Sequence, residues 1–134
     1  MITIAKTFTF DAAHSLPVCP EGHKCRRLHG HTYEVEIRLF GTPDLAGFVV
    51  DYDVIAQAWA PIGEQLDHRQ LNDIEWLGSA SSTERLVLWV FKQLVADREI
   101  GRFISAIKIS ESSTTYAEML RADFDRWLAD GGAA

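Results

Sequence analysis

Cysteine and proline are scarce in this chain, which contains two cysteines and four prolines among its 134 residues. Two cysteines, Cys19 and Cys25, are too few for a disulfide-built scaffold, and one bridge between them would close only a short loop. Long apolar runs are missing too, because no segment approaches the ~18 residues of a membrane span and residues 1–10 alternate instead of resembling an export signal. We therefore expect a cytoplasmic protein with two free thiols and no membrane partner.

Positive charge is also in short supply. The chain has 13 Lys and Arg against 19 Asp and Glu, which gives a net charge of −6. Binding to nucleic acid needs clustered positive charge, and the only dense basic stretch runs from His23 to Arg27. We therefore expect no nucleic-acid partner. With 47% hydrophobic residues, the chain has the length and composition of one domain over residues 1–134.

Alternation of apolar and polar residues predicts the strands. The first strand covers residues 3–14, and the clearest covers residues 33–39, where every second side chain is apolar. A turn and a short strand-like segment at residues 48–50 follow. Two further strands are expected at residues 103–111 and 115–120.

Apolar residues at one-turn spacing predict two main helices. One begins near Asp53 and contains Pro61, which should kink or break it. The other begins at Ser81–Glu84, whose S-x-x-E pattern is a capping box, and ends near Gly101. The spacing at residues 122–128 also fits a short terminal helix.

The order strand, strand, helix, helix, strand, strand predicts an α+β domain. Its four strands form an antiparallel sheet, and the two helices must cover one face of that sheet. The other face and two strand edges are left to solvent or to another subunit. A homo-oligomer would hide them.

Three histidines fall on the inward faces of the first two strands. His29 and His31 are two residues apart, so they project the same way, and His14 lies on the apolar side of the neighbouring strand. Three imidazoles with an open fourth position are typical of catalytic Zn²⁺. Two alternatives remain: core histidines without a metal, and a structural Cys₂His₂ zinc site that uses Cys19 and Cys25. The second matches no common finger spacing.

Cys25 has positive neighbours, Lys24 on one side and Arg26–Arg27 on the other. Positive charge near a thiol stabilises the thiolate, which would make Cys25 a usable base. Asp67 and His68 could add a carboxylate and an imidazole if the fold or an adjacent subunit brings them near Cys25. Adjacent residues need not contact each other, so a polar helix end is the alternative.

Glu111 closes the third strand on the apolar face. An isolated carboxylate there is costly unless donors reach it. A 2-amino-4-oxo heterocycle such as a pterin presents two adjacent N–H groups, which a carboxylate accepts in a bidentate geometry. The alternative is that the strand has ended and Glu111 points into water.

Five short motifs together resemble the family of 6-pyruvoyl-tetrahydropterin and 6-carboxy-tetrahydropterin synthases. The resemblance extends from residue 3 to about residue 115, and the motifs occur in the family's order and spacing. They are Phe10–His14, Cys25–His31, Leu66–His68, Ser82–Glu84 and Glu111.

The resemblance implies a tunnelling fold, in which ββααββ subunits join their sheets into barrels, as a hexamer of two stacked trimers with active sites between subunits. It implies Zn²⁺ on the histidine triad formed by His14, His29 and His31. Cys25 would be the general base, and Asp67 with His68 would complete the proton-transfer group.

The family's substrate is 7,8-dihydroneopterin triphosphate, whose side-chain hydroxyls the zinc would polarise. Glu111 would anchor the pterin ring, helped by Ser82 and Thr83. The basic stretch from His23 to Arg27 is a candidate for binding the triphosphate.

Only three residues separate Cys25 from His29, as in the 6-carboxy branch of the family. That branch also cleaves the side chain, releasing acetaldehyde and triphosphate and leaving 6-carboxy-5,6,7,8-tetrahydropterin for queuosine and other 7-deazaguanines. The alternatives are a pyruvoyl synthase, which only eliminates triphosphate, and a non-catalytic zinc- or pterin-binding protein. The tail at residues 121–134 departs from the family pattern.

Overall fold

The computed structural model describes residues 1–132, so residues 133–134 of the predicted domain lie outside the described residues. Within residues 1–132 one sheet has the strand order β3-β1-β2-β4-β5. The strands are β1 (Ile2–His14), β2 (His29–Gly41), β3 (Arg69–Gln70), β4 (Ile104–Ser110) and β5 (Tyr116–Leu120).

The long antiparallel pair β1 and β2 forms the backbone of the sheet. Its register runs from Ile2 opposite Gly41 to His14 opposite His29. Because side chains alternate along a strand, one face of β2 is buried from Tyr33 onward while the other carries charged residues. The predicted inward positions are confirmed, each 0% exposed: Tyr33, Val35, Ile37 and Leu39.

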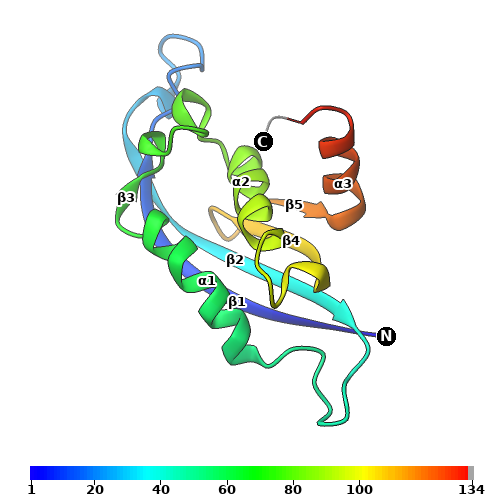
Figure 1. The fold of residues 1–134 in the computed structure, drawn as a ribbon. Helices are drawn as coiled ribbons and strands as arrows, with labels where there is room; N and C mark the ends of the chain where they lie inside the picture. The colour runs from blue at the N-terminus through cyan, green and yellow to red at the C-terminus, as the bar shows by residue number, and fades with distance from the viewer. Residues whose placement is uncertain (133–134) are drawn as a thin grey trace.

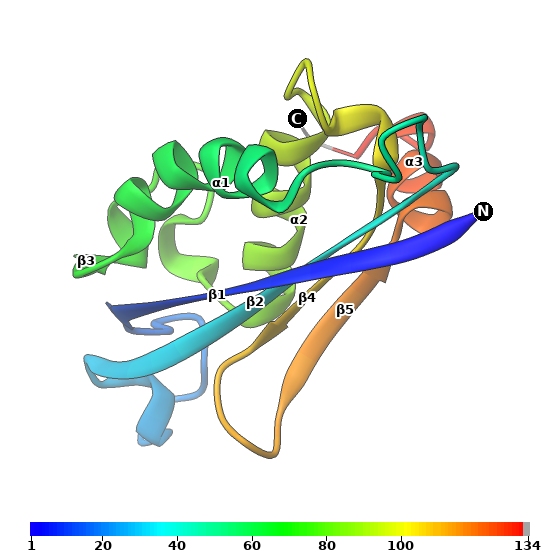
Figure 2. The same ribbon diagram turned by 90° about the horizontal axis from the view of Figure 1, so that it is seen from below.

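Three helices cover one face of this sheet (Figures 1 and 2). They are α1 (Tyr52–Leu66), α2 (Thr83–Val95) and α3 (Arg121–Ala129), so both main helices and the short terminal helix are confirmed. The core lies between the helices and the sheet, where Phe124 of α3 stacks on Phe91 of α2 at 4.4 Å between ring centroids.

The prediction that Pro61 kinks or breaks the first helix is not matched by a break, because α1 continues through it. Proline removes one backbone donor, which leaves the carbonyl of Gln57 without its helical partner. Gln57 and Pro61 are both exposed, so water can bind that carbonyl. Because Pro61 lies on the solvent face of α1, the free-energy cost of the missing hydrogen bond is reduced.

The predicted limits of α2 are wrong at both ends. Ser82, not Ser81, is the N-cap, and its hydroxyl accepts a hydrogen bond from the backbone N–H of Arg85. The helix ends at Val95, six residues before Gly101. Beyond it the carboxylate of Asp97 accepts two backbone N–H groups, which stabilises a turn in place of further helix.

Over residues 1–132 the sheet has five strands, one more than the predicted four. β3 is a two-residue strand that runs parallel to β1, pairing Arg69 with Ala12. Such a short strand has no recognisable alternation. Residues 48–50 form bends instead of the predicted strand, because the Asp44 carboxylate accepts the backbone N–H groups of Ala46 and Phe48 and holds a turn.

The sheet stays open in the single chain, and its second face carries charged residues together with the exposed Phe40, Tyr116 and Leu120. β3 borders β1 over only two residues, and β5 forms the other edge. The predicted α+β architecture is confirmed, and closure into a barrel would need other subunits. None of the helices within residues 1–132 is long and apolar enough to span a membrane.

Candidate active site

The three histidines meet where β1 ends and β2 begins. His14 and His29 are directly paired across the strands, and His31 projects from the same face of β2. Their ring centroids are 4.6 Å apart for His14 and His29, 5.3 Å for His14 and His31, and 5.0 Å for His29 and His31. One nitrogen from each ring lies within 4.8 Å of the others, so the triad could hold one metal ion.

Backbone carbonyls orient two of these rings. The Nδ1 atom of His14 lies 2.7 Å from the Ser81 carbonyl, and that of His29 lies 2.7 Å from the Arg27 carbonyl. A carbonyl only accepts, so each Nδ1 carries the proton and each Nε2 keeps its lone pair. Histidines that ligate metals are held in this way.

His14 fits a ligand best, because its Nε2 is buried and has no hydrogen-bond partner among the described residues. Burial lowers the pKa of His14, and the nearby rings of His29 and His31 lower it further. The ring therefore stays neutral, which is the form that binds a metal. A divalent cation would give its orphaned nitrogen a partner.

Glu111 lies beside the triad, one residue beyond the end of β4. The Thr83 hydroxyl donates to Glu111 Oε2 at 2.8 Å, and His31 Nε2 lies 3.8 Å from the same oxygen. Thr83 is the first residue of α2, and Ser82 caps that helix. The structure thus brings the three predicted substrate-binding residues together, and Glu111 has the donor that its position requires.

A cavity of about 950 Å³ opens in front of this group. This volume lies at the upper end of the range for small-molecule sites. The cavity is lined by the histidine triad, by Ser82, Thr83 and Glu111, and by Cys25. The cavity is also lined by Lys24, Glu84 and the hairpin residues 114–117. The sequence predicted no substrate-binding or catalytic role for Glu84 or for this hairpin. The run of hydroxyl-bearing residues directly after Glu111 was the available signal for the hairpin.

Cys25 lies in a short 3-10 helix, Lys24–Arg26, within the loop between β1 and β2. Its backbone N–H donates to His23 Nδ1 at 3.0 Å, and its carbonyl accepts from the backbone N–H of Leu16 at 2.7 Å. Both cysteines are free, as predicted. Arg26 has another partner, because its guanidinium donates to the carbonyls of Pro17 and Cys19. Of the basic residues next to Cys25, Lys24 is the one that lines the cavity with it.

Asp67 and His68 contact each other at 3.0 Å between Asp67 Oδ2 and His68 Nδ1. The other oxygen of Asp67 accepts the backbone N–H of Asp11, which lowers the pKa of Asp67, and His68 lowers it further. The hydrogen bond to Asp67 raises the pKa of His68. Neither Asp67 nor His68 is among the described residues that line the cavity. His68 instead borders a smaller hollow of about 570 Å³, which His31 also lines. Within a single chain, Asp67 and His68 therefore do not share the cavity with Cys25.

Fold and cavity together define a small α+β protein with a three-histidine cluster beside a carboxylate that can anchor a ligand. A family model described as 6-pyruvoyl tetrahydropterin synthase matches residues 3–122. The chain therefore belongs to the 6-pyruvoyl tetrahydropterin synthase family and is an enzyme of that family, as the motifs predicted.

Two relatives of the chain carry the name of the 6-carboxy branch of this family. The chain is 37% identical over 123 residues to 6-carboxy-5,6,7,8-tetrahydropterin synthase of Synechocystis, covering 87% of this chain and 92% of that protein. It is 30% identical over 115 residues to a putative 6-carboxy-5,6,7,8-tetrahydropterin synthase of Archaeoglobus fulgidus, covering 84% and 90%.

A solved structure has the same fold. The 6-pyruvoyl tetrahydropterin synthase of Caenorhabditis elegans superposes with a TM-score of 0.81 at 23% identity, covering 89% of this chain and 94% of that one. The predicted tunnelling-fold subunit is thereby confirmed.

Proposed function

We propose that the protein converts 7,8-dihydroneopterin triphosphate into 6-carboxy-5,6,7,8-tetrahydropterin, releasing acetaldehyde and triphosphate. The reaction would be zinc-dependent and would serve queuosine and 7-deazaguanine biosynthesis in the cytoplasm. One observation carries the proposal: the three histidine rings, Cys25 and the carboxylate of Glu111 line one cavity. The 37% identity to a synthase of that name supports the choice of product.

The histidine triad would hold Zn²⁺ through three imidazole nitrogens, leaving a position open toward the cavity. A zinc ion there would supply Lewis-acid polarisation of the hydroxyl oxygens on the substrate's side chain. The Ser81 and Arg27 carbonyls would keep the rings of His14 and His29 in the ligating tautomer. This supporting set makes the triad a better zinc site than one built from Cys19 and Cys25.

Glu111 would bind the pterin ring by accepting its two adjacent N–H groups. The Thr83 hydroxyl holds Glu111 Oε2, which limits rotation of the carboxylate before substrate arrives. A pteridine that lacks these N–H groups would leave the carboxylate partly unpaired. Glu111 would therefore also select for the 2-amino-4-oxo pattern.

Cys25 would act as the base that removes a proton from the substrate's side chain, and Lys24 would bind the triphosphate at the cavity mouth. His68, kept protonated by Asp67, would return a proton. Since this pair does not share the cavity with Cys25 in one chain, a neighbouring subunit would supply it. The working form would then be a homo-oligomer, a hexamer of two stacked trimers.

The second candidate is 6-pyruvoyl tetrahydropterin synthesis, favoured by the description of the matching family model. It would use the same zinc and pterin sites and stop after triphosphate leaves. The short spacing between Cys25 and His29 favours the 6-carboxy product.

Mass spectrometry of the products tests the proposal. Zinc-loaded protein is incubated with 7,8-dihydroneopterin triphosphate beside a chelated sample and a Cys25→Ala variant. We expect 6-carboxytetrahydropterin and acetaldehyde only from the zinc-loaded native protein, while Cys25→Ala keeps its zinc. A pyruvoyl product would favour the second candidate. Unchanged substrate in the presence of bound zinc would exclude both reactions, and loss of zinc from Cys25→Ala would favour a structural Cys/His site.

A further inference from the structure

Tyr33 of β2 is fully buried, at 0% exposure, yet its hydroxyl has no hydrogen-bond partner among the described residues. Leaving a buried hydroxyl unpaired destabilises a folded protein, so such groups need an explanation. The ring itself is well packed, stacking on Phe10 at 5.0 Å between centroids. Phenylalanine would make the same ring contacts, so packing alone does not explain the oxygen.

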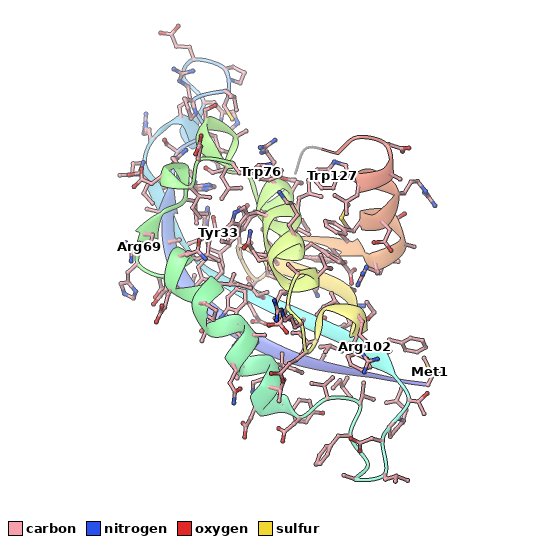
Figure 3. The ribbon with its side chains drawn as sticks, viewed as in Figure 1. Met1, Tyr33, Arg69, Trp76, Arg102 and Trp127 are labelled. Carbon is pink, nitrogen blue, oxygen red and sulfur yellow. The ribbon has the colours of Figure 1, made fainter. Side chains whose placement is uncertain are left out.

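The position of Tyr33 links it to the candidate active site. It follows His31 on the same face of β2, with the two ring centroids 5.5 Å apart, and the His14 ring lies 6.4 Å away. The pairing of β2 with β4 ends at Glu34 opposite Ser110, and the next antiparallel step sets Tyr33 opposite Glu111. Tyr33 thus lies beside the histidine triad and one strand step from the anchoring carboxylate. Figure 3 shows Tyr33 in the interior of the molecule.

We propose that Tyr33 is a positioning residue for substrate binding, its hydroxyl donating to the Glu111 carboxylate through one trapped water. This inference rests on the proposed pterin-binding role of Glu111. A carboxylate has about four acceptor positions, and Thr83 occupies one, so both the bridging water and a ligand can be accommodated.

A tyrosine hydroxyl can donate a hydrogen bond, and an ionised carboxylate only accepts, so the two groups have matching roles. A second donor on Glu111 would hold the carboxylate in one orientation, so that less conformational freedom is lost when the pterin binds.

The test measures binding of pterin itself, 2-amino-4-oxopteridine, to zinc-loaded protein by its fluorescence. The variants are Tyr33→Phe, Glu111→Gln, the double variant, and Tyr52→Phe as a control that removes an exposed tyrosine hydroxyl. We expect Tyr33→Phe to weaken binding roughly tenfold, with KM raised and kcat nearly unchanged. Zinc content should not fall, because the hydroxyl does not belong to the histidine triad. In the Glu111→Gln background, Tyr33→Phe should have no further effect.

Each other outcome overturns the inference. Equal pterin affinity for native protein and Tyr33→Phe would show that the hydroxyl has no part in binding. Lost zinc in Tyr33→Phe would make its role structural. Additive losses in the double variant would mean that Tyr33 acts independently of Glu111. If the native protein itself fails to bind pterin, the proposed function fails together with this inference.

Discussion

At the scale of single residues, His14 is the proposed metal ligand that the site could least replace. It is the only buried member of the triad, and the Ser81 carbonyl fixes its tautomer. We expect His14→Gln to reduce zinc, measured by inductively coupled plasma mass spectrometry after dialysis, from about one ion per chain to a small fraction. His23→Gln, a histidine outside the triad, is the control and should keep its zinc. Full zinc occupancy in His14→Gln would contradict the triad as the metal site.

The Asp67–His68 pair should be visible in a titration. Asp67 raises the pKa of His68, so the ring should lose its proton at a higher pH than an ordinary histidine, and Asp67→Asn should bring the pKa down. Nuclear magnetic resonance of the His68 ring protons measures this shift. Identical titration curves for native protein and Asp67→Asn would show that the pair does not form in solution.

The same two shifts fix the sign of the pair's effect on stability. The folded state holds the His68 proton more tightly, so this contribution is lost as pH rises through the raised pKa. The pKa of Asp67 is lowered, so its contribution is lost as pH falls through that lower value. The pair therefore stabilises most in mildly acidic solution, above the ordinary pKa of Asp, 3.8, and below the ordinary pKa of His, 6.5.

At the scale of elements, the connection from α2 to β4 depends on Gly101. A Cβ atom at this position would overlap the backbone carbonyl of Val95, which cannot move away as a side chain could. We expect Gly101→Ala to lower the free energy of unfolding by about 2–3 kcal/mol, measured by urea denaturation. Arg98→Ala, an exposed change in the same connection, should stay within about 0.5 kcal/mol of the native value. A native-like Gly101→Ala would show that the backbone relaxes there.

Elements with a long period could be predicted, and those set by single side chains could not. Alternation over many residues identified β1 and β2, and therefore the shared face of His29 and His31. The end of α2 depends on one carboxylate, Asp97, and the sequence offered Gly101 as an equally good stop. Two-residue β3 has no period at all.

The candidate site likewise has residues that could be predicted from the sequence and a contact that could not. The triad follows from strand geometry, and Glu111 from its place on the apolar face. The contact between Asp67 and His68 depends on the left-handed backbone of His68, with φ of 57°, and on the link from Asp67 to Asp11. Neither follows from local sequence, because the first is an uncommon conformation for histidine and the second joins residues 56 positions apart.

At the scale of the whole molecule, the open sheet and the absence of Asp67 and His68 from the cavity that Cys25 lines lead to the same expectation. If a neighbouring subunit supplies Asp67 and His68 to the cavity that holds Cys25, two inactive variants should complement each other. Cys25→Ala and His68→Ala are purified separately, mixed in equal amounts, dissociated and reassembled.

A site formed between subunits is intact only when one chain supplies Cys25 and its neighbour supplies His68. Random assembly gives this pairing in about one quarter of sites, so we expect about a quarter of native activity from the mixture. Each variant reassembled alone is the control and should stay inactive. A mixture as inactive as its components, although native mass spectrometry shows mixed oligomers, would place all three groups within one chain and contradict the shared site. Recovery near one quarter would establish the oligomer as the catalytic unit, because no single chain in the mixture carries a complete set.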